Sequence, residues 1–269
     1  MKVRAWRPTP FVAASVLLHL GAALLLLLQP SLWRWVLGAV LLDHAVISAA
    51  GLWPRSTLLG ANLVRLPEAA ARRGEVALTI DDGPDPEVTP QVLSILAAAG
   101  AQASFFCIGE RAALHPELCR AIVAAGHAVE NHGQSHRKRY SVLGWRGWLS
   151  EVGCAQATLQ TITGQRPRFF RALAGLRNPF LDPVLQRLDL RLASWTRRAY
   201  DTRSGDADAV LSRLTNKLAA GDILLLHDGH AAHTAAGLPV IVEVLPRLLD
   251  ELAARKLKAV TLSHACQSF

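Results

Sequence analysis

The sequence predicts an irregular (β/α) barrel of about seven strands, preceded by an N-terminal apolar helical hairpin. Three observations predict this fold class. From Glu75 onward, short apolar runs alternate with helical stretches, and a β-then-α order repeated this often is typical of a mainly parallel sheet. Two long apolar runs precede that pattern, and each could cross a bilayer. The 269 residues accommodate one large α/β domain plus a short appendage.

The first apolar run spans residues 11–28 and follows a basic start made by Lys2, Arg4 and Arg7. A signal peptide also starts with basic residues, but its apolar core is shorter and ends at a small-residue cleavage site. No such site appears at the end of this run. We therefore expect a transmembrane helix, because about 20 apolar residues are enough to cross a bilayer.

The second apolar run spans residues 32–52 and contains the pair Asp43-His44. Tryptophans stand near its ends, as interfacial anchors would: Trp33, Trp35 and Trp53. Ionisable groups inside a membrane are costly, so we interpret the pair as a hydrogen-bonded contact between helices rather than a proton path. The run could lie in the interface or pack on the first. We favour a helical hairpin with a short turn at residues 29–31.

The charges around the hairpin indicate its orientation. Four arginines follow the second run: Arg55, Arg65, Arg72 and Arg73. Together with the basic N-terminus they place both ends of the hairpin, and the domain that follows, on the cytoplasmic side of a cell membrane. The predicted division is a membrane segment over residues 1–53, a linker over 54–74 and the α/β domain over 75–269.

The expected strands are short apolar runs, and the expected helices are the longer stretches between them, several of which end at glycine. The strands are Val76–Ile80, Ala103–Ile108, His127–Asn131, Arg168–Arg171, Leu190–Trp195, Asp222–His227 and Ala259–Leu262. The helices are Pro90–Ala99, Pro116–Ala125, Trp145–Ile162, Pro179–Leu188, Asp206–Ala220 and Leu238–Ala254. The number of units favours a barrel over an open doubly wound sheet. No GxGxxG follows the first strand, so a dinucleotide-binding fold loses its main support.

The formal net charge of +8 does not indicate a nucleic-acid partner, because the basic residues are scattered and form no long run. A membrane surface fits this charge better. The four cysteines form no CxxC pair and no zinc-finger spacing, which favours a reducing compartment over a disulfide scaffold.

Polar residues follow the predicted strands at the points where the strands end. In chain order they are Asp81-Asp82, Asn131-His132 with His136, Arg171, Asp201, and His227-Asp228. One such pair is more often a turn or a helix cap than a site. However, functional groups of a (β/α) barrel gather at the C-terminal ends of the strands, so the whole set predicts a site on one face.

The residue types and spacing in this set predict metal-assisted hydrolysis. His132 and His136 are four residues apart, so on a helix or tight turn both rings face one point. A carboxylate from the first strand completes three ligands, which is the open arrangement of catalytic zinc sites. A second carboxylate, with its charge stabilised by a cation such as Arg171, can take a proton from water, and a histidine opposite can protonate a leaving amine.

Five segments in this order carry a family resemblance. They are Thr79–Pro84, Asn131–His136, Phe170-Arg171 with Gly175, Trp195–Asp201, and Ile223–Asp228. In order and spacing they resemble the five motifs of the NodB-homology polysaccharide deacetylases. The resemblance covers residues 75–262 but not the apolar N-terminus.

This resemblance implies a role for each matching position. It makes Asp81 the general base, with Arg171 orienting it, and His227 the general acid, with Asp201 setting its charge. The implied metal ligands are Asp82, His132 and His136, and the implied substrate contacts are Leu225, Ala174 and Trp195. The metal would be one divalent ion, zinc first, with cobalt, nickel or manganese as alternatives.

The sequence departs from the family pattern at positions that face the substrate. Gly133 stands where Ser or Thr usually follows the first metal histidine, and residues 172–174 read Ala-Leu-Ala in place of Pro-Pro-Tyr. Asp201 is followed by Thr202 rather than Trp, and Arg198 stands where an acid is common. Because the catalytic positions are kept, this divergence indicates an unusual acceptor rather than a dead enzyme.

The function expected from the sequence is therefore metal-dependent removal of an N-acyl group, acetyl first, from an amino sugar in an envelope polysaccharide or a lipid-linked glycan. One alternative is a deformylase of an aminosugar linked to a lipid phosphate. Another is a catalytically silent carbohydrate-binding or envelope-assembly protein. Retention of both an acid and a base argues against the silent alternative.

Overall fold

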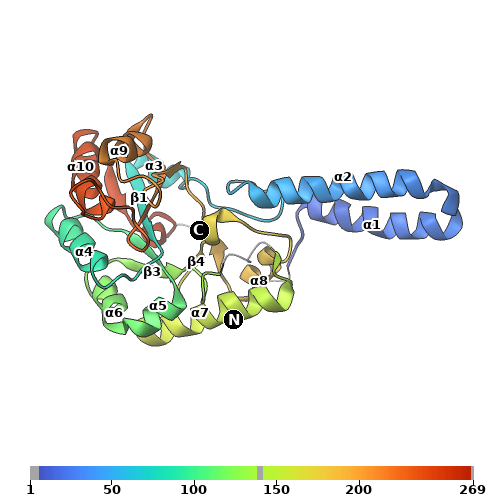
Figure 1. Ribbon diagram of the computed structural model, residues 1–269, viewed down its shortest axis with the longest axis horizontal. Coiled ribbons are helices and arrows are strands. Elements are labelled where there is room, and N and C mark those ends of the chain that lie inside the picture. Colours follow the sequence, from blue (N-terminus) through green and yellow to red (C-terminus); the bar gives the residue numbers. More distant parts are fainter. Residues whose placement is uncertain (1–5, 138–141, 268–269) are drawn as a thin grey trace.

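The computed structural model describes residues 6–137 and 142–267 (Figure 1). A helical hairpin projects to one side of an α/β domain, and the domain contains all the strands. Lys2 and Arg4, part of the basic start expected to precede the first membrane helix, lie outside the described residues.

The hairpin consists of α1 (Pro10–Leu28), a single 3-10 turn (Pro30–Leu32) and α2 (Trp33–Leu52), which lie side by side in antiparallel order (Figure 1). Thr9 caps α1 by accepting a hydrogen bond from the backbone N–H of Val12 at 3.2 Å. At a rise of about 1.5 Å per residue, each helix is ~29 Å long, close to the thickness of a bilayer core. Both helices are long and apolar enough to cross a membrane.

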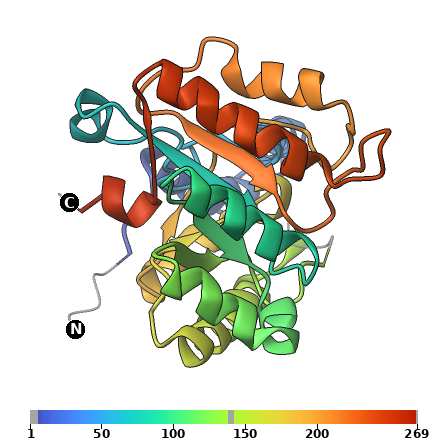
Figure 2. The ribbon, with the colours of Figure 1, turned by 90° about the vertical axis from the view of Figure 1, so that its left-hand side faces the viewer.

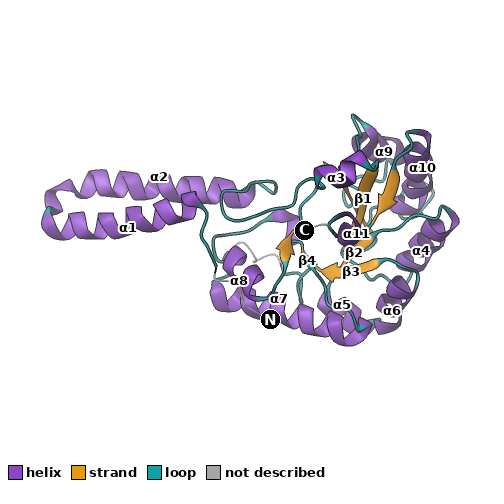
Figure 3. Cartoon of the chain, turned by 180° about the vertical axis from the view of Figure 1, so that it is seen from behind, coloured by secondary structure: helices purple, strands orange, loops and turns teal. Residues whose placement is uncertain are grey.

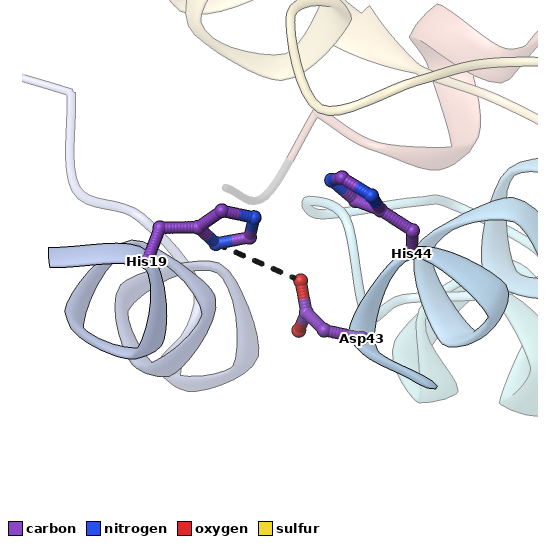
Figure 4. A group of neighbouring side chains, drawn as sticks. All are labelled: His19, Asp43 and His44. Atoms are coloured by element: carbon purple, nitrogen blue, oxygen red, sulfur yellow. Dashed lines mark ion pairs between the residues drawn. The ribbon is translucent and has the colours of Figure 1, made fainter. Parts of the chain in front are cut away.

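Polar side chains of the two hairpin helices face one another, and Figure 4 shows the His19 ring of α1 pointing toward the Asp43 carboxylate of α2. Ser15 Oγ of α1 donates a hydrogen bond of 2.7 Å to Asp43 Oδ2 of α2, which is only 8% exposed. The His19 ring lies on the same side, with Nδ1 donating to the Ser15 carbonyl oxygen at 2.8 Å and standing 3.9 Å from Asp43 Oδ2. His44 packs near His19, with ring centroids 5.2 Å apart. This geometry confirms the predicted hydrogen-bonded contact between helices at Asp43.

The base of the hairpin is bonded to the α/β domain. Trp6 Nε1 donates to Asp182 Oδ2 at 2.8 Å, and the Arg177 N–H donates to the Gly51 carbonyl at 3.1 Å. The predicted linker does not hang free, because Leu63 forms a parallel bridge with Ala193 at the edge of the sheet. The division into a membrane segment, a linker and a catalytic domain nevertheless stays a prediction.

The domain contains one sheet in which every pairing is parallel. Its strands are β1 (Glu75–Asp81), β2 (Ser104–Cys107), β3 (Ala128–Asn131), β4 (Phe169–Phe170), β5 (Arg191–Leu192), β6 (Arg197–Arg198), β7 (Ile223–His227) and β8 (Lys258–Val260). The order is β5-β4-β3-β2-β1-β7-β6, with β8 also paired to β1. The sheet curves as a half-barrel, so the predicted irregular (β/α) barrel is confirmed, with β6 as an unexpected extra strand.

Helices surround this sheet (Figures 2 and 3). They are α3 (Glu68–Arg72), α4 (Val88–Ala98), α5 (Gly109–Leu114), α6 (Pro116–Ala124), α7 (Trp145–Thr163), α8 (Leu181–Arg187), α9 (Ala207–Thr215), α10 (Val240–Ala254) and α11 (Leu262–Ala265). Helix α10 packs against both α4 and α9. The sequence predicted six of these nine helices and missed the short α3, α5 and α11.

The alternation of side chains along β1 decides what faces the interior of the half-barrel. Val76, Leu78 and Ile80 belong to the large apolar cluster beneath α4 and α10. Ala77 belongs to a different cluster, on the opposite face of the sheet. Because side chains alternate, Asp81 lies on the same face of β1 as Ala77. The interior face therefore ends in a carboxylate at the C-terminal edge of the central strand.

Candidate active site

Two central strands bring a carboxylate and an imidazole side by side. Asp81 and His227 are paired residues at the ends of β1 and β7, which run parallel. His227 shares its face of β7 with Ile223, which packs in the same interior cluster as Ala77. Both side chains are nearly buried, at 3% and 6% exposure. The sheet thus fixes the positions of a carboxylate and an imidazole across one pair of strands.

Arg171 holds Asp81 from below. Its guanidinium is 1% exposed and donates through Nη1 to Asp81 Oδ1 at 2.7 Å and to Thr79 Oγ1 at 2.7 Å. Its other nitrogens donate to the backbone carbonyls of Ala193 and Ser194 at 3.1 and 2.8 Å. Burial lowers the pKa of Arg171, which the charge of Asp81 partly offsets. Arg171 therefore fixes Oδ1 of Asp81, and Oδ2 is left without a hydrogen bond to this arginine.

Three predicted metal ligands converge at one point. Asp82 Oδ1 lies 3.1 Å from His132 Nε2 and 2.9 Å from His136 Nε2, and one ligand atom from each residue falls within 4.8 Å of the others. His132 Nδ1 lies 2.8 Å from the Arg171 carbonyl oxygen, which can only accept, so Nδ1 carries the proton. In a neutral ring the Nε2 lone pair then faces Asp82.

This donor set fits a divalent cation. His136 Nε2 is buried and has no hydrogen bond of acceptable geometry within the described chain, although Asp82 is close to it. Electron pairs on His132 Nε2 and His136 Nε2 would point at the negatively charged Asp82 carboxylate. These groups repel one another unless a positive charge lies between them. Two histidines and one carboxylate are also the ligand types of catalytic zinc sites.

The pKa shifts of Asp82 and His132 agree with that interpretation. Burial raises the pKa of Asp82, but the close approach of the His132, His136 and His230 rings more than offsets it and holds the pKa well below its usual range. Burial lowers the pKa of His132, and the charges of Asp81 and Asp82 raise it overall. The two carboxylates therefore attract positive charge to this point, whether it arrives as a proton or as a metal ion.

The loop between the two histidines is not helical, although their spacing fits a helix. Gly133 has a φ of 85° and His136 a φ of 51°, so the chain turns through left-handed conformations. Gly133 donates its N–H to Asn131 Oδ1 at 2.9 Å, and Ser135 Oγ donates to Glu151 Oε2 at 2.9 Å. Glycine suits the first of these positions because it has no Cβ. The departure at Gly133 thus has a backbone reason, and Asn131 supplies an anchoring bond.

His227 is paired with Asp201 as predicted. Its Nδ1 lies 2.8 Å from Asp201 Oδ1, and its backbone N–H donates to Asp201 Oδ2 at 2.7 Å. Burial lowers the pKa of His227, but the charge and hydrogen bond of Asp201 more than offset this and raise the pKa to about 9. The imidazole is therefore protonated at neutral pH and can donate a proton from Nε2.

The three candidate metal ligands, Asp81 and His227 line one cavity of about 530 Å³. The three predicted substrate contacts, Leu225, Ala174 and Trp195, line it together with Asp81, Asp82, His132, His136 and His227. Arg171 and Asp201 do not line the cavity but contact the lining residues Asp81 and His227 from behind. A cavity of this size is within the range that small ligands such as a sugar occupy.

Arg111 and His230 line the cavity but had no role in the sequence analysis, and Arg198 appeared there only as a departure from the family pattern. His230 Nδ1 lies 3.4 Å from Asp82 Oδ2, and Arg111 donates to the Asp82 carbonyl at 2.9 Å and contacts His230 Nε2 at 2.9 Å. A weak signal existed, because His230 follows the β7 end by three residues and Arg111 follows the end of β2. Neither position belongs to a recognisable spacing.

Comparison with known proteins gives a consistent result. The family model described as polysaccharide deacetylase matches residues 68–193. A chitooligosaccharide deacetylase of Sinorhizobium fredii is 32% identical over 196 residues, covering 71% of this chain and 91% of that protein. A peptidoglycan-N-acetylglucosamine deacetylase of Bacillus cereus is 28% identical over 198 residues, covering 73% of this chain and 70% of that protein.

A solved structure agrees in fold. The family 4 carbohydrate esterase from Streptomyces lividans, determined in complex with acetate, superposes with a TM-score of 0.62 at 30% identity. The match covers 69% of this chain and 91% of that one. The family match over residues 68–193 contains Asp81, Asp82, His132 and His136, so the similarity includes the part of the chain that forms one side of the cavity.

Proposed function

The chain belongs to the polysaccharide deacetylase family of hydrolases, and from this membership and its cavity we propose that it removes an N-acyl group from an amino sugar in a metal-dependent reaction. The observation that carries the proposal is that two buried ion pairs stand side by side at one cavity. Asp81 with Arg171 forms one pair, and His227 with Asp201 forms the other. A hydrolase of amides needs both a proton acceptor and a proton donor, and these pairs supply them.

Asp81 is the proposed general base. Its carboxylate takes a proton from the attacking water, whose oxygen bonds to the acyl carbon. Arg171 keeps the carboxylate in one orientation and stays charged because its guanidinium is always protonated. The proton acceptor is thus placed at the strand end before any substrate enters, which removes part of the ordering cost.

His227 is the proposed general acid. As the carbon–nitrogen bond breaks, it donates the Nε2 proton to the departing amine, which leaves as a neutral amino group. Asp201 stabilises the imidazolium and fixes its tautomer through the bond to Nδ1. The pKa of about 9 keeps this proton available at neutral pH.

Asp82, His132 and His136 would hold the metal, for which zinc is proposed and cobalt, nickel or manganese are alternatives. When bound, a divalent ion supplies Lewis-acid chemistry, which makes water more acidic and polarises the acyl carbonyl. The backbone at Ala174, where φ is 51°, lines the cavity opposite and is the proposed second contact for the carbonyl oxygen. Leu225 would pack on the acyl methyl and Trp195 on the sugar.

The proposed substrate is an acylated amino sugar of an envelope polysaccharide or of a lipid-linked glycan, with the hairpin anchoring the enzyme to a cell membrane. The apolar helices and the loss of the aromatic residue at 172–174 support the lipid-linked class. A formyl group on an aminosugar linked to a lipid phosphate is the alternative leaving acyl group, with the same chemistry. The domain would lie on the cytoplasmic side, because basic residues flank both hairpin ends.

The test is an incubation of the detergent-solubilised full chain with acetylated and formylated amino sugars, free and lipid-linked, followed by mass spectrometry of the products. We expect metal-dependent loss of one acyl group. His132→Ala should lose both bound metal and turnover. Full activity after chelation, or no acyl release from any substrate by the metal-loaded protein, would overturn the proposal.

A further inference from the structure

Arg198 lies on the edge strand β6, next to the strand β7 that ends at the proposed acid His227. It sits on β6, which pairs with β7 so that Arg198 is opposite Leu225. Two residues beyond Leu225 on β7 is His227. Arg198 lines the same cavity as Trp195, Thr202 and His227. A cationic side chain therefore stands where a sugar held for hydrolysis would present one of its faces.

Two aromatic rings hold the guanidinium of Arg198 in place. Its central carbon lies 5.2 Å from the centroid of Trp195 and 5.0 Å from that of Tyr200, both within cation–π range. Such stacking restricts a long flexible side chain and leaves the edges of the planar group free to donate. The two rings thus orient the guanidinium N–H groups without accepting hydrogen bonds from them.

Arg198 has no anionic partner among the residues that the structure describes. No ion pair or hydrogen bond joins it to them, and its Nε is buried without a hydrogen-bond partner. Its neighbour Arg197 is the opposite case, because it pairs with the buried carboxylate of Asp222 and with backbone carbonyls. Arg171 pairs with Asp81, and Arg111 is occupied by the Asp82 carbonyl and His230. Of the two described arginines that line the cavity, Arg198 is the one that makes no hydrogen bond or ion pair with the described residues.

A buried donor on a charged group is costly to leave unsatisfied, and it is satisfied best by a charged acceptor. The planar fork of a guanidinium matches the two oxygens of a carboxylate or the oxygens of a phosphate. A neutral sugar hydroxyl can accept one hydrogen bond but cannot neutralise the charge. The free donors of Arg198 therefore fit an oxyanion better than any part of a neutral glycan.

We propose that Arg198, held by Trp195 and Tyr200, forms a subsite for an oxyanion carried by the amino sugar, so that the preferred substrate is an anionic acylated sugar. The oxyanion is a phosphate or a carboxylate, and the two share the chemistry that the guanidinium recognises. This inference rests on the proposed function, since it concerns the same cavity. It narrows the substrate class beyond amino sugars in general.

The experiment compares kcat/KM of the metal-loaded full chain on three matched substrates. They are a neutral N-acetylglucosamine glycoside, the same sugar with a 1-phosphate, and N-acetylmuramic acid, which bears a carboxylate. Wild type should favour at least one anionic substrate over the neutral one by about 10- to 100-fold, the range that a charge-assisted hydrogen bond supplies. The anionic substrate that shows the preference identifies the source of the oxyanion.

Three variants accompany the wild type. Arg198→Gln should reduce turnover of the preferred anionic substrate about 10-fold more than turnover of the neutral one. Arg198→Lys should restore part of the preference, because it returns the charge without the planar fork. Arg120→Gln removes the same charge from an exposed site on α6 and should leave the ratio unchanged.

The outcomes separate this inference from the proposed function. If the wild type releases no acyl group from any substrate, the proposed function fails. If the wild type is active but shows no anionic preference, or if Arg198→Gln lowers all three substrates equally, the oxyanion subsite is overturned while the deacylase remains. Equal ratios for Arg198→Gln and Arg120→Gln would overturn it in the same way.

Discussion

Asp81 and Asp82 are adjacent residues that carry the same charge, yet their neighbours differ. Asp81 is bonded to the guanidinium of Arg171, whereas Asp82 faces two histidine ring nitrogens. If charge alone mattered, neutralising either carboxylate would have the same effect. The contacts predict that the two substitutions separate metal binding from proton transfer.

We expect Asp81→Asn to keep the metal and to lower kcat by about 10²–10⁴-fold, because water loses its proton acceptor. Asp82→Asn should instead weaken metal affinity, because a neutral amide is a poorer ligand for a divalent cation. Metal content by mass spectrometry and kcat at saturating metal distinguish the two. Melting temperatures control for folding, since Asp81→Asn leaves the buried Arg171 without an anion. Identical metal content and identical rate loss would show that only the charge matters.

His227 is the second residue whose environment makes a measurable prediction. The pKa of about 9 means that its proton is present below that pH and is lost as the pH rises through it, so kcat should fall on the alkaline side. Asp201→Asn removes the charge that raises this pKa, and the alkaline limb should move to lower pH. A pH profile of kcat for the two proteins measures the shift. An unmoved limb would remove Asp201 from this role.

The leaving group provides an independent check on His227. The aryloxide of an activated aryl ester leaves without being protonated, whereas the amine of a sugar amide must be protonated in order to leave. His227→Ala should therefore be strongly defective on the amide and mildly defective on the ester, while Asp81→Asn should be defective on both. Equal defects of His227→Ala on the two substrates would reject it as the acid.

At the scale of elements, helix α7 supports the strand that delivers Arg171. Trp148 of α7 is fully buried and meets Phe170 of β4 edge-on, with ring centroids 6.2 Å apart. Trp148→Ala should lower the free energy of unfolding by about 3–5 kcal/mol through the cavity it leaves. Trp148→Phe should lower the free energy of unfolding less, because an aromatic ring still fills most of the space. This holds although the substitution removes the 2.9 Å hydrogen bond to Asn178. Urea unfolding of the solubilised chain measures both, and a cost under ~1 kcal/mol for Trp148→Ala would contradict the packing role.

The central strands could be predicted from the sequence because they are buried on both faces, so β1 and β7 appear as continuous apolar runs. Strand β6 could not, since it is two arginines whose extended form depends on pairing with β7. The helix expected over residues 206–220 ends at Thr215, because the carbonyls of Asn216 and Lys217 turn to accept hydrogen bonds from Arg197. Contacts between segments far apart in the sequence determine both strand β6 and the end of α9, and the local sequence pattern carries no information about such contacts.

The same distinction applies to the cavity. Asp81 and His227 stand at the ends of paired strands, where the parallel register brings them together. Arg111, His230 and Arg198 reach the cavity through loop and edge conformations, such as the φ of 58° at His230. Long-range loop placement has no period in the sequence, so motif spacing could not indicate Arg111 and His230, and it gave Arg198 only as a departure from the family pattern.

At the scale of the whole molecule, the hairpin presents apolar side chains that the protein itself does not cover. Leu17, Leu27 and Leu42 are 68%, 81% and 68% exposed. Soluble proteins rarely expose apolar patches of this extent. Burial of these surfaces in hydrocarbon is not screened by salt, whereas surface electrostatics is. We therefore expect the full chain to sediment with membranes and to stay there in high salt, as assayed by fractionation. Release by salt alone would contradict spanning helices.

The sidedness of the domain follows from the distribution of basic residues along the chain. Arg34 is the only lysine or arginine between residues 8 and 54, while Lys2, Arg4 and Arg7 precede α1 and four arginines follow α2. The turn between the helices therefore crosses to the outside more easily than either end. In right-side-out vesicles the domain should resist an added protease, and in inverted vesicles or after detergent it should be digested. Two lysines introduced in the turn, at Gln29 and Ser31, should weaken this protection because they reduce the charge difference that orients the hairpin. Digestion of the wild-type domain in intact right-side-out vesicles would instead place the cavity, and its substrate, outside the cytoplasm.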